Sequence, residues 1–422
     1  MSAGDGRTVL FVETNSSGNG TRAMQCAQAR GLRAHFLTRT PSEYRRHDPS
    51  PLDVADEVTV VESFDVPQLM RVVAGRRYAA VLAFDELRIV QAVLLGELCG
   101  APHNPPLESI LNVRFKDLTR RALAGTPFAV RHALHSLSEP PRQSPVGYPC
   151  VVKPIDEAAS AGVVVCRDYE DFRDAIDGLR ALVAKPNSRG YRLLPEFLVE
   201  EFVDGEEWSA ELVWSRELDD WRLIGFTAKT VTPEPYRVEV GHVFPHSFGE
   251  ERDETILGQL RECLRVLGLR DTLAHVEFKL RDDRIVLIEV NPRSGGDRIT
   301  ELVDCVLGVD LVDLHLAAHL GLADEALRGA TPSGFAGIRF IRPRRAGTLE
   351  RLEVLGQAGE GLVVLRTEPT PVRVSGEDRA FARLGHAIVR GRSRVEVEER
   401  LEAEVRRVRQ LYSAVEREVV RA

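Results

Sequence analysis

Hydrophobic and polar positions alternate along two neighbouring segments in the second half of the chain. AHVEFKL (274–280) and IVLIEVNPR (285–293) are mostly apolar, and the polar turn 281–284 joins them. A period of two is typical of β-strands, so the pattern predicts two strands of a hairpin.

These two predicted strands contain three side chains with oxygen atoms that can bind a metal ion. Glu289 and Asn291 are two positions apart and therefore share one face of the second strand, while Glu277 can lie opposite them on the first. Two carboxylates and an amide oxygen suit Mg²⁺, with Mn²⁺ as an alternative. The acids could instead be ordinary solvent-facing residues, but Glu289 interrupts an otherwise apolar run. Arg293 follows, and its guanidinium can hold a carboxylate or phosphoryl group through two hydrogen bonds.

The first quarter of the chain has a different pattern. Short apolar runs at 8–12, 34–38, 57–61 and 79–84 alternate with helical stretches. Strands that alternate with helices are typical of a parallel sheet covered by helices. We therefore expect an α/β, Rossmann-like domain over about residues 1–110.

The turn after the first strand contains GxGxxA at Gly18–Ala23, which resembles a dinucleotide-binding fingerprint. Arg39, after the second strand, would suit a 2′-phosphate, but no acid ends that strand to bind a ribose. We favour a glycine- and serine-rich turn that enters a helix, and a nicotinamide-dependent oxidoreductase is the rival interpretation.

The remaining pattern predicts mixed α and β structure. A proline-containing connector at 101–115 leads to a helix at 114–124, and a proline-rich loop is expected at 138–149. Further strands are expected at 150–154, 163–166, 197–203, 337–341 and 362–366, with helices at 169–184 and from about 395.

Composition excludes several classes of protein. The chain has 422 residues, enough for two to four domains, and a formal net charge of −8 that does not favour general nucleic-acid binding. Its first residues lead directly into an apolar run, so we expect no secretory signal, and we find no apolar stretch of about 20 residues that could span a membrane. The six cysteines lack CxxC spacing, so neither a zinc knuckle nor a disulfide scaffold is indicated. We expect a cytoplasmic protein without nucleic-acid or membrane partners.

Lysine is rare: only positions 116, 153, 185, 229 and 279 carry it, among 56 basic residues. A compact ammonium suits phosphate oxygens in a tight pocket better than a guanidinium fork does. Lys153 ends a predicted strand and precedes a loop of small residues that includes Ser160 and Gly162. The backbone of such a loop can cover a triphosphate, and Lys116 can supply a second cation.

The segment LVEEFVDGEE (198–207) is a strand followed by a glycine turn with acids on both sides. Backbone groups near Phe202 can read an adenine edge, and Glu207 can bind ribose hydroxyls. The predicted ATP contacts in this segment are Glu200, Glu201, Phe202, Val203 and Glu207.

The order of these motifs resembles the ATP-grasp superfamily over about residues 110–320. Within it the chain is similar to bacterial L-amino-acid ligases, the dipeptide synthetases. That closer resemblance rests on ExxGH at Glu239–His242 followed by Pro245, on EVNPRSGGD (289–297) and on EDRAFARLGHAIVRG (377–391). It implies an N-terminal domain at 1–110, a small lid subdomain at 111–200, a metal-binding catalytic subdomain at 201–325 and a C-terminal ligase domain at 326–422.

The resemblance also implies a reaction. A carboxylate attacks the γ-phosphate of ATP to give an acyl phosphate, and an amine then displaces phosphate to form an amide. Arg293 would hold the carboxylate, the backbone at Gly295 and Gly296 would stabilise the oxyanion, and Glu239 and His242 would line the amino-acid pocket, with His242 receiving a proton. Asp297 would favour a positively charged substrate, although it could equally pair with Arg298.

Three alternatives remain open. One is a ligase of the same fold that acts on a non-amino-acid or carrier-bound amine, and another is a non-catalytic ATP-binding regulator. The third takes Glu239 and His242 as a surface acid and a core histidine. The expected partners are small-molecule carboxylates and amines, and a homodimer is an analogy with related ligases. His315 and His319, four apart on a predicted helix, are interpreted as packing residues rather than metal ligands.

Overall fold

The computed structural model describes residues 7–15, 17–45, 47–158, 160–187, 190–232, 238–375 and 382–413. The chain divides into two compact units. The first unit comprises residues 1–226, 247–296 and 309–330, and the second comprises 227–246, 297–308 and 331–422. The four domains expected from the sequence stay a prediction.

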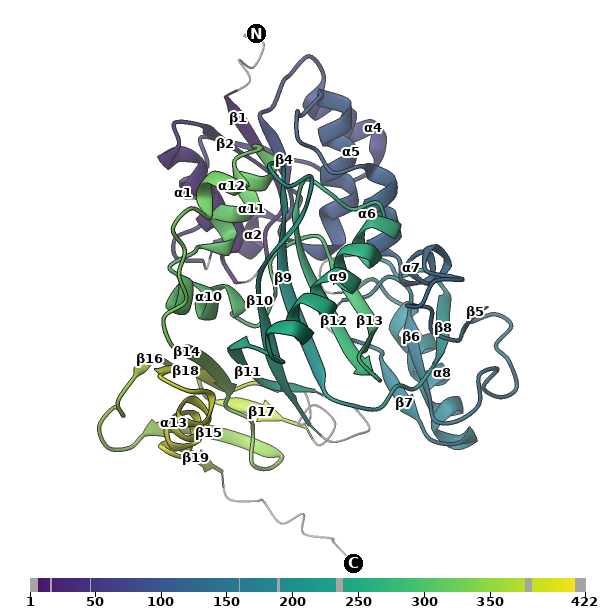
Figure 1. Cartoon of the computed structure of the whole chain (residues 1–422), viewed down its shortest axis with the longest axis vertical. Coiled ribbons are helices and arrows are strands. Elements are labelled where there is room, and N and C mark those ends of the chain that lie inside the picture. The colour runs from purple at the N-terminus through teal and green to yellow at the C-terminus, as the bar shows by residue number, and fades with distance from the viewer. Residues whose placement is uncertain are drawn as a thin grey trace, which may run out of the picture. The chain divides into compact units, whose positions relative to one another are not determined.

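A four-stranded parallel sheet opens the first unit, as the sequence predicts (Figure 1). Its order is β3 (Glu57–Val60), β2 (Arg33–Thr38), β1 (Thr8–Val12) and β4 (Ala80–Leu82). The helices of this region are α1 (Asn19–Ala29), α2 (Pro41–Tyr44), α3 (Pro51–Val54), α4 (Val66–Val73), the 3-10 turn η1 (Glu86–Arg88), α5 (Ile89–Cys99) and α11 (Leu311–His319). Apolar side chains of β1 and β2 form one core with the inner faces of α1 and α11. Burial of such surface from both sides explains why these strands are almost wholly apolar.

A second, antiparallel sheet of four strands follows along the chain. Its order is β5 (His132–Ser136), β8 (Glu196–Glu201), β6 (Cys150–Pro154) and β7 (Val164–Cys166). Helix α8 (Tyr169–Val183) packs against β6 and β7 through Phe172, Ile176 and Leu179. Asp168 caps this helix by accepting from two backbone N–H groups of its first turn.

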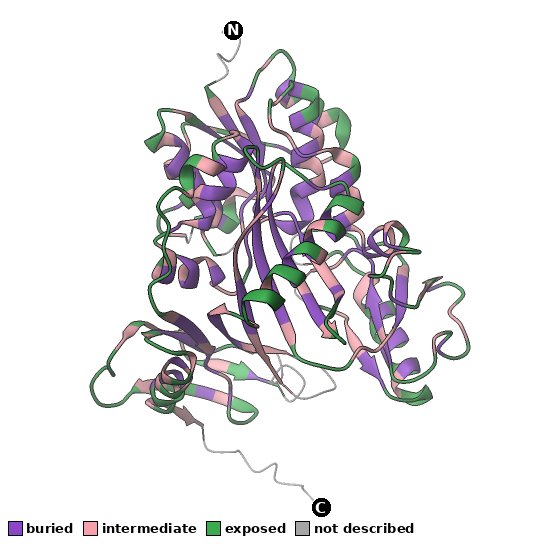
Figure 2. Ribbon diagram, viewed as in Figure 1, coloured by how far each residue is buried: buried purple, intermediate pink, exposed green. Residues whose placement is uncertain are grey.

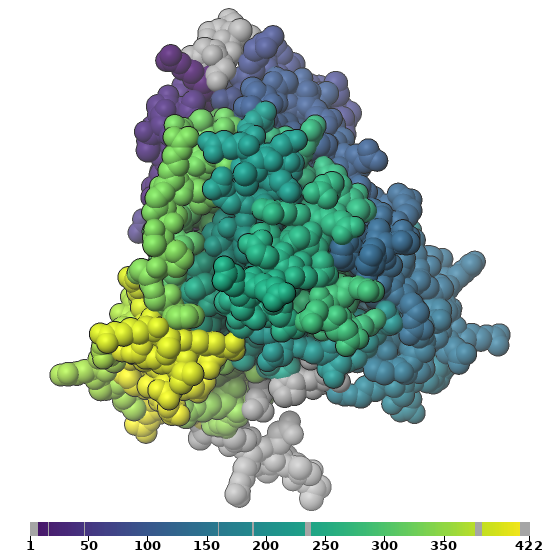
Figure 3. Space-filling model, in the orientation of Figure 1, coloured from purple at the N-terminus to yellow at the C-terminus, as the bar shows by residue number. Residues whose placement is uncertain are grey.

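The predicted hairpin is present and belongs to the longest sheet. In the first unit the strand order is β13 (Arg284–Asn291), β12 (Leu273–Arg281), β9 (Glu207–Ser215) and β10 (Asp220–Val231), whose residues from Thr227 belong to the second unit. Asp282 and Asp283 form the turn with positive φ of 50° and 62°, as type I′ hairpin turns require. Helix α9 (Glu250–Val266) packs on β13, with its outer face exposed in Figures 2 and 3.

The second unit continues with antiparallel strands β11 (Glu239–His246), β14 (Phe335–Phe340), β18 (Gly385–Gly391) and β16 (Leu362–Thr367). Helices α10 (Ile299–Leu307) and α13 (Arg394–Arg406) pack on β14. A three-stranded sheet of β17 (Val372–Val374), β15 (Gly347–Val354) and β19 (Val408–Tyr412) completes this unit. The short helix α12 (Ala323–Ala326) belongs to the first unit.

Two predictions of secondary structure are wrong in detail. The helix expected at 114–124 is two helices, α6 (Leu107–Arg114) and α7 (Lys116–Ala122), because Phe115 is extended at φ −100° and ψ 115°. This break frees the backbone N–H of Lys116 to donate to the Ile155 carbonyl at 2.9 Å. Strand β19 follows α13, where the sequence predicted only a helix.

Within the described ranges, no helix combines the length and the hydropathy that crossing a bilayer requires.

The GxGxxA turn leads into α1, and Gly20 approaches Thr14 closely. The Gly20 N–H donates to Thr14 Oγ1 at 3.0 Å, and a Cβ at this position would overlap the Thr14 side chain. Gly20→Ala should therefore lower the free energy of unfolding by about 1–3 kcal/mol, measured by urea denaturation.

Gly258→Ala is the matched control, because Gly258 is exposed on α9 with open space around its Cβ position. That variant should gain up to about 1 kcal/mol. Equal effects of the two substitutions would contradict the close contact at Gly20.

Candidate active site

The hairpin places the predicted metal ligands on adjacent strands. Glu277 on β12 is paired directly with Glu289 on β13, and His275 is paired with Asn291. Glu289 and Asn291 therefore share a face with Glu277, as the alternating pattern predicts. Asn291 is buried, with 5% of its surface exposed.

Lys116 neutralises the second of these acids. Its ammonium lies 2.8 Å from Glu289 Oε1 and 2.8 Å from the Glu157 carbonyl oxygen. Burial and the charge of Glu277 raise the pKa of Glu289, but the charge and hydrogen bond of Lys116, together with the charge of Lys153, hold it below its usual value. Two carboxylates thus stay charged side by side only in the presence of a cation.

His275 holds the first acid, a contact that the sequence did not reveal. Its Nε2 lies 3.1 Å from Glu277 Oε1, and its Nδ1 forms a short hydrogen bond with the buried Glu211 on β9. Burial alone would lower the pKa of His275, yet the two carboxylates raise it to about 10. The side chain is therefore an imidazolium at neutral pH.

Gly295 lies against this buried pair. Its N–H donates to Glu211 Oε2 at 3.2 Å, and a Cβ would come within 2.8 Å of both Glu211 Oε1 and His275 Nδ1. The N–H predicted to stabilise an oxyanion is thus already bonded to Glu211. This N–H could donate to an oxyanion only if its bond to Glu211 broke. Gly296, the other predicted donor, is exposed.

The donor set fits the divalent metal expected from the sequence. Glu277 and Glu289 contribute carboxylate oxygens from adjacent strands, Asn291 an amide oxygen, and the clustered negative charge requires compensation. Mg²⁺ prefers oxygen ligands of this kind.

A buried triad surrounds Lys153. Glu200 accepts from Arg120 Nε at 2.7 Å and lies 2.8 Å from the Lys153 ammonium. Burial would raise the pKa of Glu200, but the two cations lower it to about 2. Burial lowers the pKa of Lys153 to about 8 in spite of Glu200. Arg120 was missed from the sequence because α7 brings it in from a remote segment.

The strand predicted to read adenine is organised by Lys279. Its ammonium donates to the Val203 carbonyl oxygen at 2.8 Å, lies 3.5 Å from Glu207 Oε1 and stands 5.1 Å from the centre of the Phe202 ring. Glu201 instead pairs with Arg131 at 3.0 Å. Of the predicted nucleotide contacts, Lys153 and Glu200 thus belong to one cluster, and Phe202, Val203 and Glu207 lie around Lys279, both in the first unit.

The small-residue loop after β6 forms a tight turn. Ser160 is exposed with φ 57°, and the Val163 N–H donates to its carbonyl oxygen at 3.1 Å. Gly162, with φ 75°, packs against Leu179 and Leu182 of α8, where a side chain would clash. Ala159 of this loop lies outside the described residues.

Arg293 is held by an acid from the 3-10 turn η1, which follows the last strand of the parallel sheet. Its Nε donates to Glu86 Oε2 at 2.7 Å, and its Nη1 donates to the Ser294 carbonyl oxygen at 3.0 Å. Burial opposes the charge of Arg293, but Glu86 raises its pKa above the usual value. Glu86 carried no signal in the sequence, since it lies in a 3-10 turn more than 200 positions away.

The predicted substrate residues Glu239, His242 and Asp297 form a cluster within the second unit. His242 Nε2 lies 3.4 Å from Asp297 Oδ2 and 3.6 Å from Glu239 Oε2. Lys229 forms a short ion pair with Glu239. Three ligand atoms of this cluster lie within 4.8 Å of one another.

Asp297 is paired with a different arginine from the one considered in the sequence. It pairs with both Nη atoms of Arg383, at 2.5 and 2.7 Å, and not with Arg298, which pairs with Glu301. The Asp297 carboxylate, which was predicted to attract a cationic substrate, is thus already paired with an arginine of the C-terminal motif. Residues 377–381 of that motif lie outside the described residues.

Four of the five lysines contact acids of the predicted site. Lys116, Lys153, Lys229 and Lys279 pair with Glu289, Glu200, Glu239 and Glu207 respectively, and Lys185 is exposed. The rarity of lysine was therefore an informative signal.

The two helical histidines are buried, as the packing interpretation expected. His315 and His319 on α11 have their Nε2 atoms 3.2 Å apart, and each lies 3.4 Å from Thr272 Oγ1. Burial lowers the pKa of both, that of His319 to about 3, so neither carries charge at neutral pH.

Residues 146–301 match the model of the ATP-grasp domain. The crystal structure of an L-amino acid ligase from Bacillus licheniformis superposes with a TM-score of 0.78 at 18% identity, covering 97% of this chain and 99% of that one. The similarity to this structure lies in the fold.

Two relatives are similar in sequence. The uncharacterized protein y4rH of Sinorhizobium fredii is 27% identical over 387 residues, which are 88% of this chain and 76% of that protein. An alanine–anticapsin ligase of Bacillus subtilis is 26% identical over 181 residues, which are 40% of this chain and only 38% of that ligase.

The charged His275 makes a testable contribution to stability. Because its pKa is about 10 in the folded protein and near 6.5 in the unfolded chain, the stabilisation is complete below pH 6.5 and is lost as the pH rises towards 10. The gap in unfolding free energy between wild type and His275→Gln should narrow over this range, with a slope approaching about 1.4 kcal/mol per pH unit.

Urea denaturation across this pH range measures the gap. His35→Gln is the control, since burial lowers the pKa of His35 to about 4 and leaves it neutral throughout. A gap for His275→Gln that does not change with pH would show that His275 is uncharged.

Proposed function

Because the chain contains an ATP-grasp domain, we propose that it is an ATP-dependent ligase that joins a carboxylate to an amine, with an amino acid as one substrate. The observation that supports this most is the hairpin. It carries two paired carboxylates, Glu277 and Glu289, next to Lys116, and the same strand leads directly to Arg293. A phosphate-handling region and a carboxylate-binding cation thus share one rigid element.

The first half of the proposed reaction transfers the γ-phosphoryl group of ATP to the substrate carboxylate, giving an acyl phosphate and ADP. Such a transfer depends on positioning and charge neutralisation more than on covalent help from the protein. Lys116 and Lys153 provide buried cations for the phosphates. Glu277, Glu289 and Asn291 would hold Mg²⁺, which supplies neutralisation of the phosphate charge.

Arg293 is proposed to orient the carboxylate. Its Nε is bonded to Glu86 and its Nη1 to a backbone carbonyl, so the guanidinium plane is fixed before a substrate arrives. A preorganised cation costs little rearrangement when charge develops on the reacting group.

In the second half the amine attacks the acyl carbon, the C–O bond to phosphate breaks, and an amide forms with loss of one proton from nitrogen. His242 is proposed to receive that proton. It is 1% exposed, and its Nε2 lies 3.4 Å from Asp297 Oδ2 and 3.6 Å from Glu239 Oε2.

A non-catalytic ATP-binding regulator is the alternative from another class. A pure binder has no need of Arg293, whose orientation by Glu86 is costly to maintain in a buried setting.

Measurement of the products distinguishes a ligase from a non-catalytic regulator. ADP release and product mass should be measured with a panel of carboxylates and amines, including non-amino-acid amines, and at least one pair should give stoichiometric ADP and amide. ATP binding without ADP release for every pair would contradict the ligase and support the regulator.

Arg293→Ala should bind ATP as the wild type does and lose amide formation by about 100-fold or more, because the carboxylate loses its charged partner. Arg284→Ala is the control, since Arg284 is exposed at the start of the same strand. Activity of Arg293→Ala equal to that of the control would remove Arg293 from the proposed mechanism.

A further inference from the structure

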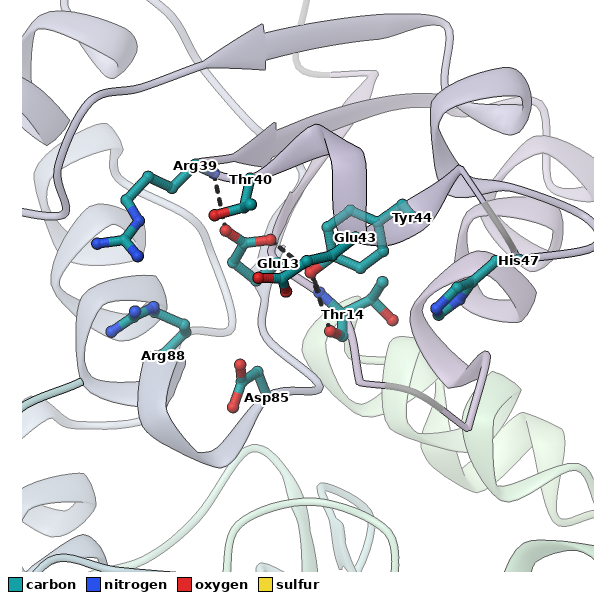
Figure 4. Close-up of a pocket in the computed structure, with 9 residues that line it drawn as sticks. All are labelled: Glu13, Thr14, Arg39, Thr40, Glu43, Tyr44, His47, Asp85 and Arg88. Carbon is teal, nitrogen blue, oxygen red and sulfur yellow. Dashed lines mark hydrogen bonds between the residues drawn. The ribbon is translucent and has the colours of Figure 1, made fainter. Parts of the chain in front are cut away.

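A pocket of about 220 Å³ opens at the carboxyl end of the parallel sheet, within the first unit (Figure 4). None of the residues assigned above to ATP, metal or substrate lines it. Glu13 and Thr14 follow β1, Arg39 and Thr40 follow β2, and Asp85 and Arg88 follow β4.

The position of this pocket in the fold favours a ligand. In the order β3-β2-β1-β4 the chain builds to one side of β1 and then crosses to the other, so the order reverses between β1 and β4. Open α/β sheets bind ligands in the crevice outside the carboxyl ends of the strands at such a reversal. We call this cavity the switch-point pocket.

Glu13 forms the floor of the switch-point pocket and is already satisfied. Its carboxylate accepts from the Thr38 hydroxyl at 2.9 Å, the Arg39 backbone N–H at 2.8 Å and the Tyr44 hydroxyl at 2.5 Å. Its backbone has φ 55°, an unfavourable conformation for a residue with a Cβ. Strain of this kind, in a fully bonded residue at a strand end, is typical of sites that the fold holds rigid for binding.

Two guanidinium groups lie together on one side of the pocket (Figure 4). Arg88 is only 6% exposed, and its guanidinium carbon stands 4.3 Å from the centre of the Phe64 ring. Burial lowers the pKa of Arg88 and the charge of Arg39 contributes to this, although the charges of Asp85 and Glu13 oppose it. Arg39 lies against Gly190, and within the described part of the chain its guanidinium forms no ion pair.

The lining also carries three acids, Glu13, Glu43 and Asp85, and Arg88 Nη1 donates to the Leu87 carbonyl oxygen at 3.3 Å. Asp85 accepts from the Leu87 N–H at 3.1 Å as the cap of the 3-10 turn η1, and Glu43 is exposed at the rim. Glu13 is fully bonded to the three donors described above. The polar groups that remain directed into the pocket beside the two guanidiniums are hydroxyls and His47.

One short turn connects this pocket with the proposed reaction centre. Asp85 and Arg88 line the pocket, whereas Glu86 between them binds Arg293. A ligand group in the pocket is therefore held by the same turn that orients the guanidinium proposed to hold the reacting carboxylate.

We propose that the switch-point pocket binds a second, distal anionic group, a carboxylate or a phosphate, on the acid substrate that Arg293 orients. Arg39 and Arg88 bind this group as a pair, which suits a planar or tetrahedral oxyanion. The volume is below the roughly 300–1,000 Å³ of pockets that enclose a whole small molecule, so the pocket takes one end of the substrate. The identity of the ligand as a substrate rests on the proposed ligase activity; its binding does not.

Binding is tested without ATP by calorimetry on the full chain, so an inactive ligase does not obscure the result. Two pairs of probes differ in the distal group: L-glutamate against L-glutamine, and O-phospho-L-serine against L-serine. At least one anionic probe should bind about tenfold or more tighter than its neutral partner. The pair that shows the preference identifies the anion as carboxylate or phosphate.

Arg39→Gln should bring that ratio close to one, and Arg88→Gln should do the same if its melting temperature shows that it is folded. Arg45→Gln is the matched control, because Arg45 is exposed nearby but does not line the pocket. Equal affinity for charged and neutral probes, a preference for L-lysine over both anions, or a ratio that Arg39→Gln leaves unchanged would each overturn the proposal.

Discussion

The direct pairing of Glu277 with Glu289 across the hairpin is the constraint on which the rest of the first unit depends. Like charges opposite each other on adjacent strands repel, and burial makes the repulsion stronger because water no longer screens it. The fold compensates from both sides. Lys116 reaches Glu289 from the start of α7, and the imidazolium of His275 holds Glu277 and Glu211. The break at Phe115 places Lys116 at the start of α7, where its backbone N–H donates to the Ile155 carbonyl oxygen.

The same principle recurs wherever this chain buries an acid next to a predicted ligand contact. Removal of one partner from a buried ion pair is strongly destabilising, so such pairs persist only where something requires them. Lysine occupies four of these places in a chain that otherwise uses arginine. A compact ammonium can be drawn from its carboxylate towards a phosphate by rotation of a flexible stem, whereas a guanidinium fork such as that of Arg293 is suited to a fixed orientation.

Most of the architecture could be predicted from local sequence patterns. The parallel strands, the hairpin and the face shared by Glu289 and Asn291 follow from periodicity, which depends only on residues near one another in the chain. Glu86, Arg120 and Glu211 could not be found in this way, because each reaches the site from another segment and has an unremarkable sequence context. The pairing of Asp297 was misjudged for a related reason. Arg298 is adjacent in sequence, but at φ 63° it begins α10 and pairs with Glu301, which leaves Asp297 to Arg383.

The 3-10 turn η1 connects the switch-point pocket with the guanidinium of Arg293. Asp85 caps the turn, Glu86 accepts a hydrogen bond from Arg293 Nε, and Arg88 lines the switch-point pocket. A group that binds Arg88 would stabilise this conformation of η1. The same segment holds Arg293 through Glu86. Because Glu86 and Arg88 belong to one short turn, we expect occupancy of the proposed pocket to affect the alignment of Arg293. The glycine turn after β1 contributes to the same edge by fixing Thr14 through Gly20, so the motif that resembles a dinucleotide fingerprint has a structural role here.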